Sequence, residues 1–228
     1  MAAMIPGHRL RAALVVAAVL LLGGCGGSDD DGAANTDAGG TSTSAAASDP
    51  QLGPAFGSMT SLPGALDRPP PWGANQRDLQ LRLRAIGLDP LTAEGQVVHI
   101  HQHLDIYANG KKVTVPANLG IGPEQAFISD LHTHDTTGIM HVESPTQRSF
   151  SLGQFFAVWG VPLSAKCIGS LCETGAKQLR AWVNGDAVKA DPTRIVLDQH
   201  QEIVLAYGTQ AQMPAPVPAS YDFAAAGV

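Results

Sequence analysis

The sequence predicts a mainly β (α+β) fold, a small sheet roll or β-sandwich built from hairpins with one short helix. Residues 97–108 alternate between apolar and polar side chains, which is the pattern of a strand with one buried face. Asn-Gly pairs at 109–110 and 184–185 are typical of the two-residue turns that join antiparallel strands. One segment, 151–160, combines helix-capping residues with closely spaced apolar residues. These observations together favour hairpins arranged around a helix.

The residues on either side of the first Asn-Gly pair form the most strongly indicated hairpin. Pairing across a two-residue turn sets Ile106 opposite Val113. It sets Leu104 opposite Val115 in the same way, so the apolar faces of the two strands agree. The opposite face of the first strand carries polar residues, which are His99, His101, His103, Asp105 and Tyr107.

A second hairpin is predicted between residues 128–134 and 139–144, with residues 135–138 as its loop. This register sets His132 opposite His141, and directly opposed Cβ atoms lie about 4.5–5.5 Å apart. A slip of one residue would move His141 to the other face. The residues that share one face in the predicted register are His132, His134, His141 and Glu143.

The remaining elements follow in order. Residues 76–88 have leucines at helical spacing and predict a short amphipathic helix. Ser151 and Gln154 have the spacing of a capping box, and Gly160 is a typical helix end. The second Asn-Gly pair joins a further hairpin, and residues 202–207 predict a last strand.

The first 25 residues have the features of a lipoprotein signal peptide. A basic segment precedes the apolar residues 12–22, and the sequence Leu22-Gly23-Gly24-Cys25 resembles the bacterial lipobox. Lipidation of Cys25 would anchor the protein to a bacterial membrane in an extracytoplasmic position. The alternative is an ordinary cleaved signal with an incidental cysteine.

Composition divides the rest of the chain into three parts. Residues 26–75 are rich in Gly, Ser, Ala and Pro and predict a disordered tether. Residues 76–208 hold the strand patterns and predict a single histidine-rich β domain. Residues 209–228, rich in Ala and Pro, predict a disordered tail.

The two cysteines beyond Cys25 are Cys167 and Cys172. In an oxidising compartment they predict a short disulfide loop, and a pair of thiolate metal ligands is the alternative.

Charge and motifs exclude several functions. The chain has 14 Lys and Arg against 20 Asp and Glu, a net charge of −6, and no basic stripe that would neutralise nucleic acid phosphates. It has no nucleophile elbow, phosphate-binding loop or dinucleotide fingerprint, so chemistry without a metal lacks sequence support.

Histidines carry the strongest functional signal. Six of the eight fall in two clusters, HIHQH at 99–103 and HTHDTTGIMH at 132–141. On a strand, the spacing H-x-H places two imidazoles on one face, and a third from a neighbouring strand completes a common site for copper or zinc. The alternatives are a solvated polar face without a ligand and a pH-sensing cluster. The candidate metal ligands are His99, His101, His103, His132, His134 and His141.

Three carboxylates accompany these histidines. Asp105, Asp135 and Glu143 are expected to orient the imidazole rings through hydrogen bonds, and direct ligation of the metal is the alternative for Asp135 and Glu143. Glu143 or Asp135 is also a candidate general base, should the protein be an enzyme. For Asp135 the alternative is hydrogen bonding within the hairpin loop.

Three sequence blocks resemble an uncharacterised family of exported bacterial proteins and lipoproteins. The shared pattern reads HxHxHL, then HTHDxxGxxHxE, then LGQFFxxWG, and the resemblance covers about residues 76–208. The resemblance implies an extracytoplasmic location and one domain, and it implies no activity.

Three functions remain open. The first is a membrane-anchored extracytoplasmic protein that binds copper or zinc. The second is a metal-dependent hydrolase or oxygenase, in which three histidines hold the ion and a carboxylate moves protons. The third is a metal-free envelope interaction or pH-sensing module.

Overall fold

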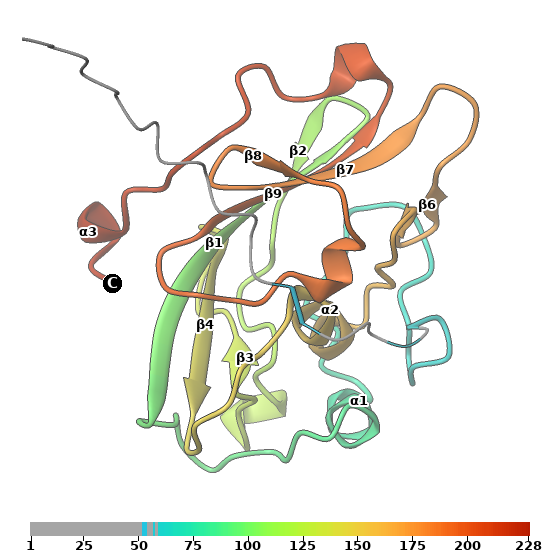
Figure 1. Ribbon diagram of the computed structural model, residues 1–228. Coiled ribbons are helices and arrows are strands. Elements are labelled where there is room, and N and C mark those ends of the chain that lie inside the picture. The colour runs from blue at the N-terminus through green and yellow to red at the C-terminus, as the bar shows by residue number, and fades with distance from the viewer. Residues whose placement is uncertain (1–51, 54–56, 58) are drawn as a thin grey trace, which may run out of the picture. The chain divides into compact units, whose positions relative to one another are not determined.

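A computed structural model describes residues 52–53, 57 and 59–228 of the chain (Figure 1). The predicted signal peptide of residues 1–25, the lipidated Cys25 and residues 26–51 of the predicted tether lie outside the described residues. In the part of the chain that the structure describes, no helix is long and apolar enough to cross a membrane.

The fold is built around one mixed sheet. The strands are β1 (Val98–Ala108), β2 (Lys111–Val113), β3 (Leu131–His132), β4 (Ile139–Ser144), β5 (Cys167–Ile168), β6 (Leu171–Cys172), β7 (Gln178–Val183), β8 (Asp186–Val188) and β9 (Glu202–Gly208). The main sheet has the order β3-β4-β1-β9-β7-β8 with β2 paired to β1, and β5 and β6 form a separate two-stranded sheet. β1 and β9 run parallel, whereas the other neighbours run antiparallel. The mainly β (α+β) class is therefore confirmed.

Both hairpin registers that lead to the histidines are confirmed at their centres. Ile106 pairs with Val113 across the first Asn-Gly turn, and His132 pairs with His141. The first hairpin is shorter than expected, because β2 ends at Val113 and the pairing of Leu104 with Val115 does not form.

Three α-helices are described, namely α1 (Leu79–Ala85), α2 (Leu152–Trp159) and α3 (Phe223–Ala226). Short 3-10 helices span Pro123–Gln125, Pro192–Arg194 and Gln210–Gln212. α2 has the predicted capping box, in which the Ser151 hydroxyl accepts from the Gln154 amide and the Gln154 side chain accepts from the Ser151 amide. Gly160 ends this helix at a φ of 81°, in the left-handed region that favours glycine.

The alternation along β1 decides which face of the sheet is buried. Leu104 and Ile106 are at most 1% exposed and belong to the core that also contains Phe155 and Trp159 of α2. Successive side chains of a strand point to opposite faces, so the histidines of β1 lie on the face away from α2. The core thus fixes the orientation of the histidine face.

Two segments that composition predicts to be disordered contribute buried side chains. Trp72 is 2% exposed and Met59 3%, although both lie in the predicted tether. Phe223 in the predicted tail is 5% exposed. Figure 1 shows the C-terminal segment in red running to α3 beside β1. The structure differs from the prediction here because a few large apolar side chains suffice to hold segments whose composition is otherwise dominated by Pro, Gly and Ala.

Arg82 of α1 ties the segment before the helix to the end of α2. Its side chain is fully buried, and its guanidinium donates to the backbone carbonyls of Val158, Pro63 and Asn75. Burial lowers the pKa of Arg82 to about 10, and the negative charge of Asp78 partly offsets this effect. The side chain remains charged at neutral pH, and its hydrogen bonds link three separate chain segments.

Candidate metal centre

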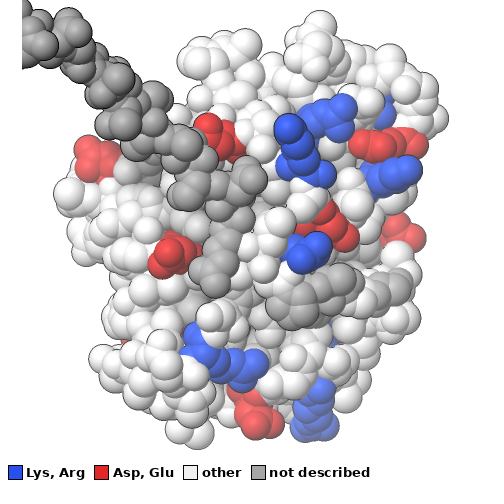
Figure 2. All heavy atoms as spheres, in the orientation of Figure 1, with Lys and Arg blue, Asp and Glu red and all other residues white. Residues whose placement is uncertain are grey.

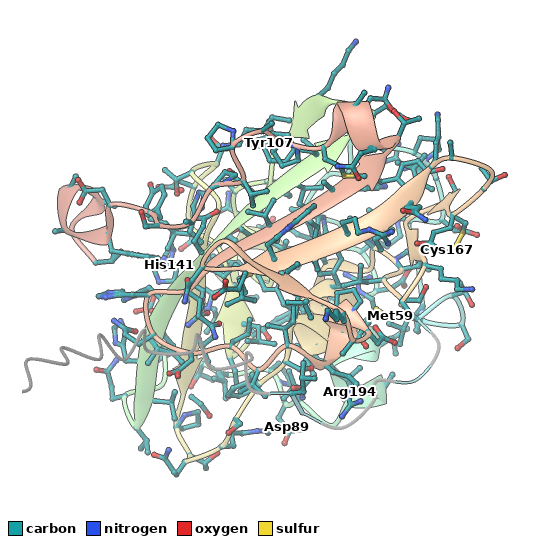
Figure 3. The ribbon with its side chains drawn as sticks, turned by 45° about the horizontal axis from the view of Figure 1, so that its top comes forward. Met59, Asp89, Tyr107, His141, Cys167 and Arg194 are labelled. Carbon is teal, nitrogen blue, oxygen red and sulfur yellow. A yellow bond between two sulfur atoms is a disulfide. The ribbon has the colours of Figure 1, made fainter. Side chains whose placement is uncertain are left out.

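The strand order brings the two histidine clusters together on one face of the sheet. In the antiparallel β1–β4 ladder, His101 lies opposite His141 and His99 lies opposite Glu143. His141 also pairs with His132 of β3 on its other side. Five of the six predicted histidine ligands therefore form one continuous group across β3, β4 and β1. Figure 3 shows His141 well apart from the disulfide at Cys167.

The first set of candidate ligands, called the β3–β4 group, contains His132, His134, His141 and Glu143. One donor atom from each residue lies within 4.8 Å of the others. The Nε2 atoms of His132 and His134 are 3.2 Å apart, and Nδ1 of His141 is 3.1 Å from Oε1 of Glu143. Ligands that bind a tetrahedral zinc or copper ion at about 2.0–2.1 Å lie ~3.3 Å from one another. The spacing of these donors fits such an ion.

A backbone hydrogen bond orients His132 for ligation. Its Nδ1 lies 3.0 Å from the carbonyl oxygen of Ser129, which can only accept, so Nδ1 carries the proton. The lone pair of Nε2 then points toward His134 and Glu143. Metal-binding imidazoles are commonly held in this way, with the other ring nitrogen bonded to a backbone carbonyl. Burial lowers the pKa of His132 to about 4, and the nearby Glu143 carboxylate partly offsets this effect. The ring is therefore neutral at pH 7 and able to bind a metal.

Glu143 lies at the base of the group. Its side chain is only 3% exposed, and its Oε2 has no hydrogen-bond partner among the described residues. Burial raises the pKa of Glu143, but the hydrogen bond from His141 and the proximity of His132 and His99 outweigh it and leave the pKa below its usual value. The carboxyl group is thus ionised at neutral pH, with one buried oxygen that lacks a partner in the described chain. Such an atom is unfavourable unless a ligand satisfies it.

A second set of candidate ligands, called the β1 group, contains His99, His101 and the same Glu143. Nε2 of His99 is 3.4 Å from Oε1 of Glu143, and the rings of His99 and His101 have centroids 5.0 Å apart. Burial lowers the pKa of His101 to about 4, and the neighbouring His141 and His99 add to this effect. This ring is also neutral at pH 7.

His103, the sixth predicted ligand, lies apart from the other five. Its Nδ1 is 2.7 Å from Oε2 of Glu202 and its Nε2 is 2.9 Å from the carbonyl oxygen of Thr137. Tyr221 of the C-terminal segment stacks on the ring at a centroid distance of 3.9 Å. With Asp105 and Glu202, His103 forms a third set of closely spaced donors. Both of its ring nitrogens are already engaged, so it belongs to a buried hydrogen-bonded network.

The other two predicted carboxylates lie outside the β3–β4 and β1 groups. Asp105 forms an ion pair of 2.7 Å with Lys112 and accepts a hydrogen bond from Tyr107. Asp135 accepts hydrogen bonds from the amide and hydroxyl of Thr137, and these bonds lower its pKa. This is the loop role that the sequence left open for Asp135.

Sequence reasoning missed three polar neighbours of the histidines. Glu202 meets His103 through the parallel pairing of β1 and β9. Oε1 of Glu94 lies 3.5 Å from Nε2 of His134, and the His200 amide donates to the His101 carbonyl at 2.7 Å. These contacts join distant segments, and the sequence around Glu94 and Glu202 contains no pattern that signals them.

One side of the centre is buried, here called the buried floor (His132 and Glu143), and the other side is open to solvent. His132 and Glu143 are buried, whereas the side chains of His99 and His134 are 44% and 45% exposed. A cavity of about 380 Å³ adjoins His134 and is lined in part by Phe127 and Ile121. Solvent and small molecules therefore have access to one side of the centre.

The remaining chemical features lie elsewhere. Cys167 and Cys172 form the predicted disulfide between β5 and β6. Figure 2 shows Lys and Arg side chains interspersed with Asp and Glu on the face that it presents.

Comparisons of this chain with protein-family models, with curated proteins and with solved structures find no match. The function has to be argued from the geometry of the centre itself.

Proposed function

We propose that the protein binds a transition-metal ion, copper or zinc, through the β3–β4 group. The observation that supports this most strongly is the convergence of four donor atoms within 4.8 Å, one of them from a buried carboxylate. Oε2 of Glu143, which has no hydrogen-bond partner among the described residues, is 3.8 Å from Nε2 of His132, so an ion between these atoms would satisfy both.

The type of donor supports copper or zinc over other ions. Three imidazole nitrogens and one carboxylate oxygen suit both ions, whereas magnesium and calcium prefer sets of oxygen ligands. A nitrogen-rich site binds Cu(II) more tightly than Zn(II), and the supply of each metal decides which one occupies it.

We propose further that the protein works outside the cytoplasm, attached to a bacterial membrane by a lipid at Cys25. This part of the proposal rests on the signal-peptide features of residues 1–25 and on the resemblance of the histidine blocks to exported proteins. The disulfide between Cys167 and Cys172 is consistent with an oxidising compartment. The partners in this proposal are the metal ion and the membrane.

The proposal is tested by counting metal ions in the purified full chain after incubation with copper or zinc and removal of excess metal. We expect retained metal in the wild type and its loss in His132→Ala/His134→Ala. The single variant His134→Ala removes a half-exposed side chain, so it should fold as the wild type does, and circular dichroism would verify this. It too should lose the metal, which would show that the loss does not come from misfolding. His200→Ala is the matched control, since His200 belongs to none of the three sets of donors, and it should retain the metal. No retained metal in the wild type would overturn the proposal in favour of a metal-free module.

A metal-dependent enzyme is the second candidate, and the cavity beside His134 favours it. Its volume of about 380 Å³ lies in the range of small-molecule sites, and Phe127 and Ile121 give it an apolar wall. In this function the three histidines of the β3–β4 group hold the ion, and Glu143 accepts a proton. Replacing the metal with Co(II) provides a test, because azide added to an open coordination position shifts the visible spectrum. An unchanged spectrum would argue for a closed binding site without a position for substrate.

A further inference from the structure

The β3–β4 and β1 groups share one residue, Glu143, and otherwise consist of different histidines. The β1–β4 register places His99 directly opposite Glu143, while His132 approaches Glu143 from the β3 side. The carboxylate therefore lies between two sets of imidazoles.

The two oxygens of this carboxylate contact histidines of both sets. Oε2 is 3.8 Å from Nε2 of His132, whereas Oε1 lies between the sets, 3.4 Å from Nε2 of His99 and 3.1 Å from Nδ1 of His141. A carboxylate oriented in this way can give one oxygen to each of two ions. Oε2 has no other partner among the described residues, so it is free for this role.

His101 provides a second, independent observation. Its side chain is buried at 7% exposure. In the described part of the chain its ring contacts the rings of His99 and His141, and no hydrogen bond to either of its nitrogens is found there. An imidazole nitrogen that no protein group engages has its lone pair available to bind a cation.

We propose that the centre is dinuclear, with a second copper or zinc ion in the β1 group and the carboxylate of Glu143 bridging the two ions. The inference rests on the proposed function, because the first ion is the one held by the β3–β4 group. Ions in two-metal sites lie about 3.5–4 Å apart, where their mutual repulsion is large. The single negative charge of Glu143 between them offsets that repulsion.

The β1 group offers the second ion three donors from the protein, and this leaves a coordination position open. The half-exposed ring of His99 places that position at the solvent side of the centre. Water, hydroxide or a small anionic ligand would complete the coordination of this ion. The second ion is therefore expected to exchange more readily than the first, which is bound closer to the buried floor.

The test is a copper titration of the full chain, with bound copper counted and the electron paramagnetic resonance signal of Cu(II) recorded at each step. We expect two equivalents in the wild type. The signal should grow with the first equivalent and weaken per copper with the second, because a bridging carboxylate couples the spins of the two ions. His99→Ala/His101→Ala should bind one equivalent and give an uncoupled signal.

Controls separate failure of this inference from failure of the proposed function. His99→Ala alone alters an exposed ring and should also lose the second equivalent, and His200→Ala should keep both. One equivalent in the wild type, unchanged in His99→Ala/His101→Ala, would overturn the dinuclear centre and leave the proposed function intact. Two equivalents with fully additive signals would overturn the shared carboxylate. No bound copper in the wild type would overturn the proposed function itself.

Discussion

His101 lies directly opposite His141 in the β1–β4 ladder, with the centroids of the two rings 4.6 Å apart. This pair lies in the β1–β4 ladder, which joins two histidine clusters that are separate in the sequence. Without that ladder, the histidines of β1 would lie apart from those of β3 and β4. With it, five histidines surround a single buried carboxylate.

Replacing Glu143 with Gln should weaken metal binding while preserving the shape of the site. The amide removes the negative charge that faces His99 and His132, so we expect at least about a tenfold loss of affinity for copper and zinc. Isothermal titration would measure this. Glu124→Gln, at an exposed carboxylate, is the matched control and should bind as the wild type does. Equal affinities for the two variants would exclude Glu143 as a ligand.

The metal-free protein should lose stability as the pH falls from 6.5 toward 4. The pKa of His132 is about 4 in the folded protein and 6.5 as an ordinary value, so the unfolded chain binds the proton more readily. The contribution of His132 is fully present above pH 6.5 and falls by about 3 kcal/mol as the pH approaches 4. Burial lowers the pKa of His101 as well, so its contribution to stability changes with pH in the same direction. Urea unfolding between pH 7.5 and 4 measures this trend, and a free energy of unfolding that stays constant would contradict it.

Bound metal should stabilise the folded chain. A ligand present at 100 times its dissociation constant adds about 2.7 kcal/mol to the free energy of unfolding when it binds only the folded state. We expect zinc to raise the unfolding temperature by several degrees and a chelator to reverse the change. In His132→Ala/His134→Ala, the first ion is lost and zinc should raise the unfolding temperature much less than in the wild type. A similar rise in that variant would place the ion elsewhere.

Arg82→Met should destabilise the fold without altering metal stoichiometry. The substitution leaves the carbonyls of Val158, Pro63 and Asn75 without the donors that Arg82 provides, and we expect a loss of about 2–4 kcal/mol. Arg84→Met changes an exposed arginine on the same helix and should stay within about 0.5 kcal/mol of the wild type. Denaturant unfolding compares the two variants, and equal stabilities would show that the hydrogen bonds of Arg82 contribute little to the free energy of unfolding.

The sequence predicts the parts of the fold that local patterns determine. The Asn-Gly turn and the alternation of side chains predict the pairing of Ile106 with Val113, and loop length predicts the pairing of His132 with His141. Ser151 and Gln154 predict the start of α2 in the same local way. Each of these follows from residues that are close together in the chain.

The assembly of the centre depends on pairings between distant segments, which local patterns do not determine. The β1–β4 ladder brings His99 to Glu143, and the parallel β1–β9 pairing brings His103 to Glu202. The sequence therefore indicates a metal site but not that the two clusters meet. The packing of Trp72 was missed for a related reason, since one buried ring hardly alters the composition of its segment.

The most direct test of the central claim is anomalous diffraction at the copper or zinc absorption edge from crystals of the metal-loaded protein. We expect a peak about 2.0–2.1 Å from Nε2 of His132, in contact with His134, His141 and Glu143. A dinuclear centre adds a second peak beside His99 and His101. Bound metal with no anomalous peak among these residues would show that the ion binds elsewhere in the protein.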